Sequence, residues 1–254
     1  MEIVDEIARL SRNHRAVVVY SSAIPVARAL SLDISSTAKK FVARIVSALD
    51  GQILLMPTFT SGYDSNNFLS LDHEKSSTGI ISEVFRQTAN VRTPSAFFSF
   101  SATGPDTEKF TNLRPHFAWG EGSLYEWMFN SDALIVTIGL HPTHCSFTHY
   151  AESLMEDKIN YRKHKKFSGT IELEGHTQTL DEVLFVRHTT PQAINDFTWL
   201  SEPYRAAGQE LVRKDGVLIS AIPAQRKIEV ILKFLQKNPN ALISNREDIC
   251  DSTI

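Results

Sequence analysis

Three short apolar runs divide the chain, at residues 16–20, 53–56 and 133–140. Continuous runs of this length, rich in β-branched side chains, are typical of strands that are buried on both faces of a parallel sheet. Each run stops at a segment rich in hydroxyl or histidine side chains. Because the carboxyl ends of parallel strands meet at one edge of a sheet, we expect these segments to line one crevice. Their backbone N–H groups and hydroxyls suit a phosphate-bearing ligand.

Segments of helical periodicity separate the runs. Residues 35–49 place apolar side chains at helical spacing, with Ser35 and Ser36 as candidate N-caps. Further helices are expected at 1–12, from about 78, at 124–129, from about 148 and at 228–235. Strands that alternate with helices predict an α/β fold, with a central mostly parallel or mixed sheet and helices on both of its faces.

The pattern changes near residues 167–188. Two β-rich runs, 170–174 and 182–186, flank a loop with Gly175, which predicts a small antiparallel β insertion. The basic run 162–166 just before it is expected to be a solvated turn, since charge runs mostly lie on wet surface. No linker or repeat interrupts the sequence, so we expect residues 1–254 to form a single domain.

Composition narrows the class of protein. The hydrophobic share of the 254 residues is 42%, ample for a core, and the net charge of −3 argues against a general nucleic-acid binder. Cys145 and Cys250 lie far apart, which disfavours a disulfide framework and fits a reducing compartment. The first residues lack a signal-peptide pattern, and no apolar run approaches the ~20 residues that span a bilayer. We therefore expect a cytoplasmic protein without a membrane partner.

Candidate chemistry concentrates in residues 141–152, which hold three of the nine histidines and one of the two cysteines. His149 and Glu152 are three residues apart, so on a shared helix they are neighbours. A carboxylate beside an imidazole orients the ring and raises its basicity. Ser146 lies one turn earlier. The three side chains form a candidate catalytic group, although the same spacing also fits an ordinary pair on a helix surface.

The same segment allows two other interpretations. His141, His144, Cys145 and His149 are zinc ligands by residue type and would make a metal-dependent hydrolase. Their spacing matches no standard zinc pattern, so no metal is expected. Cys145 also fits a thiol nucleophile, although a free cysteine is more often a small buried side chain. Sequence patterns for dinucleotide binding, for a P-loop and for a serine-hydrolase elbow are absent.

Six short motifs occur in the order found in one known family. They lie at residues 19–23, 55–60, 78–86, 92–104, 120–123 and 146–152. Together they resemble the aminoglycoside 3-N-acetyltransferase family, and the resemblance extends over about residues 16–170. The first histidine of the family's motifs is Tyr20 here, and its central His-Pro falls on Ser95 and Ala96. Residues 162–170 resemble the branch that is found with surface-glycan sugar pathways.

The resemblance implies the transfer of an acetyl group from acetyl-CoA to an amine of an amino sugar. It implies that His149 is the general base, that Glu152 orients it, and that Ser146 donates to the tetrahedral oxyanion. The amine attacks the thioester directly, so no acyl-enzyme is required. The expected contacts to the cofactor are Ser21, Ser22, Ala23, Thr58, Phe59, Thr60, Ser99 and Ser123.

The resemblance leaves the acceptor open between an aminoglycoside and a nucleotide-linked or glycan-precursor amino sugar. A polycation would suit the acidic side chains of the polar loop, Asp64, Asp72 and Glu74, whereas a nucleotide-linked sugar would suit the basic run 162–166. The altered position Tyr20 also allows a family member that binds CoA without catalysis.

Overall fold

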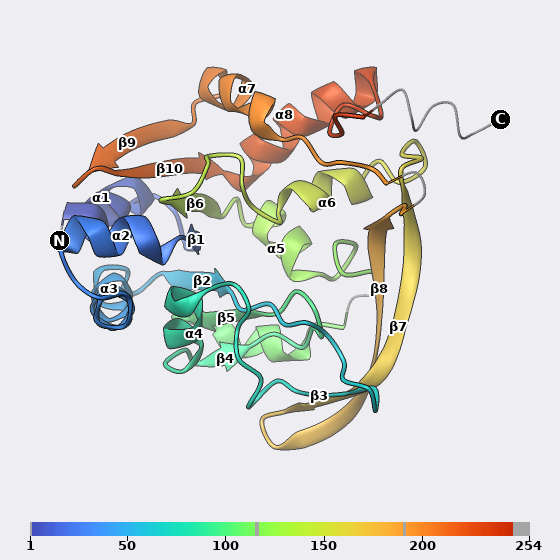
Figure 1. Cartoon of the computed structure of the whole chain (residues 1–254), viewed down its shortest axis with the longest axis horizontal. Coiled ribbons are helices and arrows are strands. Elements are labelled where there is room, and N and C mark those ends of the chain that lie inside the picture. Colours follow the sequence, from blue (N-terminus) through green and yellow to red (C-terminus); the bar gives the residue numbers. More distant parts are fainter. Residues whose placement is uncertain (1, 115–116, 190–191, 246–254) are drawn as a thin grey trace.

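The computed structural model describes residues 2–114, 117–189 and 192–245, and its centre is a seven-stranded mixed sheet (Figure 1). The strands are β1 (Ala16–Ser21), β2 (Ile53–Pro57), β4 (Val91–Arg92), β5 (Phe100–Thr103), β6 (Leu134–Ile138), β9 (Glu210–Lys214) and β10 (Val217–Pro223). Their order is β4-β5-β2-β1-β6-β10-β9. β1 is parallel to both β2 and β6, whereas the outer pairs are antiparallel. The three predicted apolar runs are thus confirmed as the three parallel strands.

Helices cover both faces of this sheet, as predicted. One face holds α1 (Glu2–Ser11), α2 (Ala23–Leu30), α3 (Ile34–Ala48) and α4 (Ile80–Arg86). The other holds α5 (Leu124–Asn130), α6 (Thr148–Ser153), α7 (Ser201–Ala206) and α8 (Ala224–Lys237), with short 3-10 helices at Thr107–Asn112 and Thr198–Leu200. Val17 and Val19 join the first core and Val18 the second, because successive strand side chains point to opposite faces. Burial of each such side chain contributes ~1.5–3 kcal/mol.

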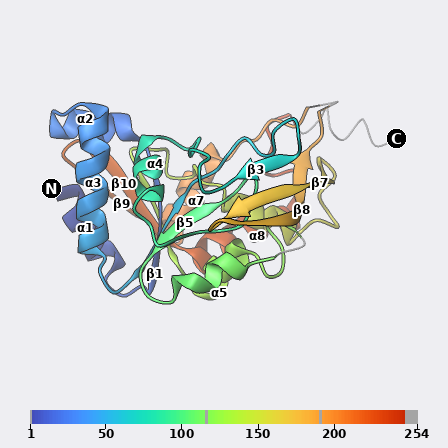
Figure 2. The same ribbon diagram turned by 90° about the horizontal axis from the view of Figure 1, so that it is seen from below.

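A three-stranded sheet of β3 (Phe68–Ser70), β7 (Arg162–Leu173) and β8 (His176–Arg187) stands beside the central one. It lies at the end of the molecule opposite α1, α2 and α3 (Figure 2). The predicted antiparallel insertion is confirmed, with Gly175 at a positive φ of 71° in the turn. The hairpin is longer than expected, because the basic run 162–166 belongs to β7 and pairs with β8 instead of forming a turn.

Two other expectations are corrected. Helix α2 and the β9–β10 pair were not predicted, although Val217–Pro223 is a mostly buried apolar run of seven residues. The N-cap of α3 is Asp33, whose carboxylate accepts the backbone N–H of Ser36 at 2.9 Å. Ser35 and Ser36 therefore lie inside the first turn of the helix.

The parallel strands fix where a site can form. Because β1, β2 and β6 run in the same direction, the segments that follow Ser21, Pro57 and Ile138 emerge at one edge of the sheet. The segment after β6 leads directly into α6. Cys145 in that segment is a buried free thiol, and Cys250 lies outside the described residues. Over the described ranges, no helix has the length and apolar character needed to cross a membrane.

Candidate active site

The predicted pair His149 and Glu152 is brought together on α6. The Nδ1 atom of His149 lies 2.5 Å from one carboxylate oxygen of Glu152. The other carboxylate oxygen accepts from the hydroxyl of Tyr161 at 2.8 Å and from Nε of Arg162 at 2.9 Å. Glu152 is completely buried, and the His149 side chain is 20% exposed. The carboxylate is therefore fixed from three sides, while the imidazole keeps one side open.

The surroundings set the protonation states of this pair. Burial opposes ionisation of Glu152, but Arg162 and His149 outweigh it and lower the pKa of Glu152 to about 2. Burial and then Arg162 lower the pKa of His149 below its ordinary value of 6.5, against the opposing effect of Glu152. At neutral pH Glu152 is thus a carboxylate and His149 is a neutral imidazole. Because Nδ1–H donates to the carboxylate, Nε2 is the nitrogen that can take up a proton.

Ser146, the third predicted catalytic residue, lies between two tyrosines. Its Oγ is 3.0 Å from the hydroxyl of Tyr20 and 2.9 Å from the hydroxyl of Tyr125. Burial raises the pKa of Tyr20 and of Tyr125 above the ordinary value, so both phenols keep their protons. A serine oxygen can accept two hydrogen bonds and donate one. If both tyrosines donate to Ser146, its own O–H is available to a third partner.

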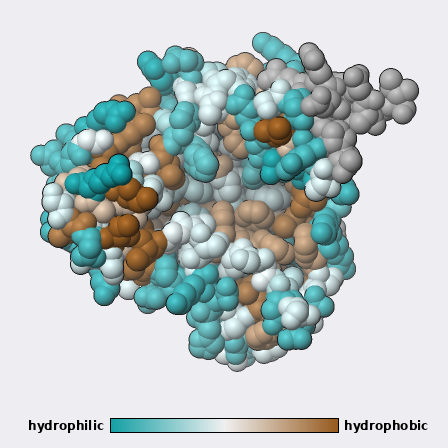
Figure 3. Space-filling model, viewed as in Figure 1, coloured by the Kyte–Doolittle hydropathy of each residue, from teal (hydrophilic) through white to brown (hydrophobic). Residues whose placement is uncertain are grey.

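Two cavities meet at His149. The strand-end cavity, about 450 Å³, is lined by Tyr20, Ser21, Pro57, Phe59, Thr78, Ser82, Leu140, His144, Cys145, Ser146, His149, Asn195 and Phe197. The hairpin cavity, about 310 Å³, is lined by Phe98, Trp119, His149, Arg162, Leu184, Phe185, Val186, Arg187, His188, Thr189, Gln192 and Asn195. His149 and Asn195 belong to both. In the view of Figure 3 pale and brown residues fill the middle of the molecule, and teal residues occupy much of the edge.

Some of the predicted cofactor residues lie at the strand-end cavity. Ser21 and Phe59 line it, and the Oγ of Ser21 is buried with no hydrogen-bond partner among the described residues. Ser22 and Ala23 follow at the start of α2, where the Ser22 side chain makes no capping bond. The N–H of Ser22 donates to the carbonyl of Ile138 at 2.9 Å, so what the first strand end offers at the cavity is the unpaired hydroxyl of Ser21.

The other predicted cofactor residues make hydrogen bonds within the protein. The hydroxyl of Ser99 donates to the carbonyl of Thr58 at 2.7 Å, and the guanidinium of Arg92 donates to the same carbonyl at 2.6 Å. Thr58 and Ser99 are fully buried. Thr60 donates to the carbonyl of Ala96, and Ser123 caps α5 by accepting the N–H of Glu126 at 3.1 Å. These four side chains shape the loops around the cavity and do not line it.

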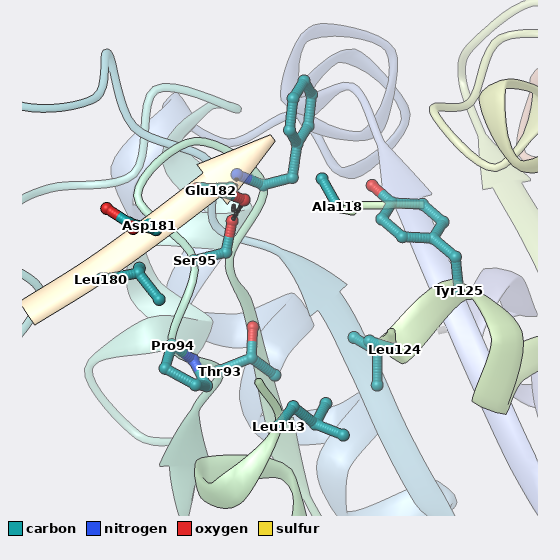
Figure 4. A pocket seen from close by; sticks show the side chains of 11 residues that line it. Thr93, Pro94, Ser95, Leu113, Ala118, Leu124, Tyr125, Leu180, Asp181 and Glu182 are labelled. Carbon is teal, nitrogen blue, oxygen red and sulfur yellow. Dashed lines mark hydrogen bonds between the residues drawn. The ribbon is translucent and has the colours of Figure 1, made fainter. Parts of the chain in front are cut away.

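A third cavity, shown in Figure 4, lies where the hairpin is attached to the loop before β5. Its volume is about 30 Å³, room for about one water molecule. Glu182 of β8 is buried there, and burial raises its pKa. It accepts from the hydroxyl of Ser95 at 2.5 Å and from the N–H of Ala96 at 2.9 Å. Ser95 and Ala96, which stand where the family has His-Pro, thus tie the loop before β5 to the hairpin.

The histidine-rich segment does not assemble a metal cage. Throughout 2–114, 117–189 and 192–245, no group of three or more His, Cys, Asp or Glu side chains is placed to hold a metal ion. The Nδ1 atom of His141 lies 2.8 Å from the hydroxyl of Thr143. His144 and Cys145 line the strand-end cavity beside Ser146.

Several residues of the site were not predicted from the sequence. Arg162 and Tyr161 bind Glu152 from the start of the hairpin, and Asn195 lies within 3.4 Å of Arg162. Trp119 and Phe197 pack their rings edge-on against His149, with centroids 5.5 and 5.9 Å away. Arg162 was visible only as the first residue of a charge run. Its burial, which separates it from its exposed neighbours, is a property of the tertiary structure.

The fold and site define an α/β enzyme in which a buried His–Glu pair stands where two cavities meet. Residues 32–219 match the family described as aminoglycoside 3-N-acetyltransferase, which is most of the chain. The chain therefore belongs to this family and is an N-acetyltransferase. A sequence search among curated proteins finds no match.

Solved structures share the fold along almost the whole chain. The binary complex of AAC-IIIb with CoASH is 17% identical, with a TM-score of 0.73, over 92% of this chain and 95% of that one. The YokD protein from Bacillus subtilis is 15% identical, with a TM-score of 0.71, over 94% and 93%. AAC-VIa with bound sisomicin is 18% identical, with a TM-score of 0.72, over 92% and 97%. At these identities the likeness shows the fold.

Proposed function

We propose that the protein transfers an acetyl group from acetyl-CoA to an amine of an amino sugar, with His149 as general base. The observation that carries this proposal is the bond from Nδ1 of His149 to a buried carboxylate that Tyr161 and Arg162 hold in place. This bond leaves Nε2 of a neutral imidazole to accept a proton from the amine. The family membership supports the reaction class, and a neighbour of the same fold binds CoASH.

The proposed reaction proceeds in one ternary complex. The amine nitrogen attacks the thioester carbonyl carbon and forms the N–C bond, while its proton passes to Nε2 of His149. The C–S bond then breaks, and the CoA thiolate takes the proton from the imidazolium. Glu152, ionised at all working pH values, stabilises the imidazolium between these two steps.

The tetrahedral oxyanion needs a donor, and we assign this role to Ser146. When Tyr20 and Tyr125 both donate to its Oγ, the serine proton is directed to the oxyanion. Loss of one such donor typically costs about 10²–10³ in rate.

We propose that acetyl-CoA occupies the strand-end cavity, with its polar groups at the first strand end. The buried, unpaired hydroxyl of Ser21 and the neighbouring Ser22 and Ala23 supply donors, and Phe59 supplies an apolar wall. Thr58, Thr60, Ser99 and Ser123 contribute by holding the loops in shape.

The decisive experiment measures thiol release from acetyl-CoA with a panel of aminoglycosides and nucleotide-linked amino sugars. We expect His149→Ala to reduce turnover about 10²–10⁴-fold, the usual contribution of a general base. CoA binding, followed by calorimetry, should persist in this variant. His176→Ala is the matched control, because His176 is an exposed histidine at the hairpin turn. Undiminished turnover in His149→Ala would remove His149 from the mechanism, and CoA binding without transfer to any amine would show a non-catalytic member.

A further inference from the structure

The hairpin cavity is electropositive. Its titratable lining consists of Arg162, Arg187, His188 and His149, and among its described lining residues there is no carboxylate. Glu152 lies behind the lining and is already bound to Arg162. The strand-end cavity, by contrast, has no lysine or arginine in its lining. The two cavities that meet at His149 therefore differ in charge.

Of the two arginines in this lining, Arg187 is the one without a carboxylate partner among the residues that the structure describes. It pairs with Arg162 across the β7–β8 ladder, so the two guanidinium groups start from the same face of the hairpin. Like charges placed opposite one another are unfavourable unless an anion lies between or beside them. Glu152 neutralises Arg162, whereas the guanidinium of Arg187 donates to a neutral group, the carbonyl of Ala193, at 2.8 Å. Within the described segments no carboxylate lies at ion-pair distance from Arg187.

The rest of the lining suits a sugar. Phe98 and Trp119 form an aromatic wall, with ring centroids 4.7 Å apart. Thr189, Gln192 and Asn195 add polar side chains to the same lining. Aromatic faces bury the C–H surface of a pyranose ring, and amide and hydroxyl groups bind its oxygens. The wall borders His149 through Trp119, so a sugar stacked there brings its amine to the base.

We propose that the hairpin cavity holds the acceptor, and that this acceptor is an amino sugar with an anionic group, a carboxylate or a phosphate, which pairs with Arg187. This inference rests on the proposed function. A guanidinium binds such groups through two parallel N–H bonds. A polycation such as an aminoglycoside would instead place ammonium groups beside two arginines.

Two of the three acidic residues of the polar loop, Asp64 and Asp72, serve other contacts. The carboxylate of Asp64 accepts the N–H groups of Asn66 and Phe68, and Asp72 accepts those of Glu174 and Gly175. Neither aspartate lines the strand-end or the hairpin cavity. The acidic side of the polar loop is thus used to shape turns.

The experiment compares acceptors that differ in charge. Initial rates with acetyl-CoA are measured for glucosamine, glucosamine 1-phosphate, the corresponding amino-uronic acid and sisomicin. We expect kcat/KM to be highest for the two anionic acceptors and lowest for sisomicin. Arg187→Gln should lower the ratio of kcat/KM for anionic over neutral acceptor by about tenfold or more, as expected for a charge-assisted hydrogen bond. Arg187→Lys should retain part of the ratio, and Arg213→Gln, an exposed arginine on β9, should leave it unchanged.

Three results would overturn the inference. The first is a wild-type preference for sisomicin, and the second is an equal loss of kcat/KM for neutral and anionic acceptors in Arg187→Gln. The third is a rise in KM in that variant that is confined to acetyl-CoA, which would assign Arg187 to a phosphate of the cofactor. Should Arg187→Gln fail to fold, the order of wild-type acceptors decides alone. Transfer without charge preference would leave the proposed function standing, whereas no transfer to any amine would remove both.

Discussion

At the scale of the residue, the site depends on the charge of Glu152. This carboxylate is fully buried and is bound by His149, Tyr161 and Arg162. Removal of one member of a buried ion pair costs about 3–5 kcal/mol, because the other charge is left without a partner. Since the folded-state pKa of Glu152 is about 2, below its ordinary value of 4.5, this stabilisation is present above pH 4.5 and is lost as the pH falls toward 2.

The contacts of His149 predict how its imidazole titrates. Its pKa is lowered, so we expect its NMR titration midpoint to lie below pH 6.5. In Glu152→Gln the midpoint should fall further, because the carboxylate is the neighbour that favours the imidazolium. The His149→Ala spectrum assigns the resonance. A wild-type midpoint above pH 6.5 would contradict this account of the site.

Part of the arrangement around Glu152 could be predicted from the sequence. The spacing of His149 and Glu152 was enough to place them together, since residues three apart on a helix are neighbours. Arg162 was missed because the sequence gives no sign that one arginine of a basic run turns inward. Its partner Glu152 is ten residues away, and contact depends on how β7 begins beside α6.

At the scale of the element, helix α5 and the β7–β8 hairpin hold the site in place. α5 brings Tyr125 to Ser146, and its first turn is fixed by the Ser123 cap. The hairpin brings Arg162 and Arg187 to the cavity, and Glu182 fastens it to the loop at Ser95. The first is a local hydrogen bond, whereas the second joins residues 87 positions apart in the chain.

The cap of α5 can be tested directly. Ser123→Ala should lower the free energy of unfolding by ~1 kcal/mol, because the N–H of Glu126 loses its acceptor. Ser123→Thr keeps the hydroxyl and should unfold at nearly the wild-type urea concentration. Equal midpoints for the two variants would show that the cap contributes little. The KM for acetyl-CoA, measured on the same variants, reports whether Ser123 also contacts the cofactor.

At the scale of the whole molecule, the meeting of two cavities at one imidazole favours a ternary complex. The strand-end cavity is formed at the parallel strand ends, and the hairpin cavity is closed by an element from a different sheet. In the proposed arrangement each substrate occupies its own cavity, and His149 is the candidate base in the lining of both. This arrangement needs no covalent carrier of the acetyl group.

Steady-state kinetics tests this arrangement. Double-reciprocal plots at several acceptor concentrations should intersect, as expected for a ternary complex, and Cys145→Ser should keep turnover close to that of the wild type. Parallel lines, together with loss of turnover in Cys145→Ser, would indicate an acetyl-enzyme on Cys145 instead.

The amino-acid sequence alone establishes the three parallel strands, the helices between them except α2, and the proximity of His149 and Glu152. These follow from local periodicity, which needs only a few neighbouring residues. The tertiary structure alone decided that a basic run becomes a strand, that Arg162 enters the core, and that Arg187 faces a cavity without a carboxylate among its described lining residues. These depend on contacts between segments far apart in the chain, because burial and charge pairing are set by packing and not by spacing.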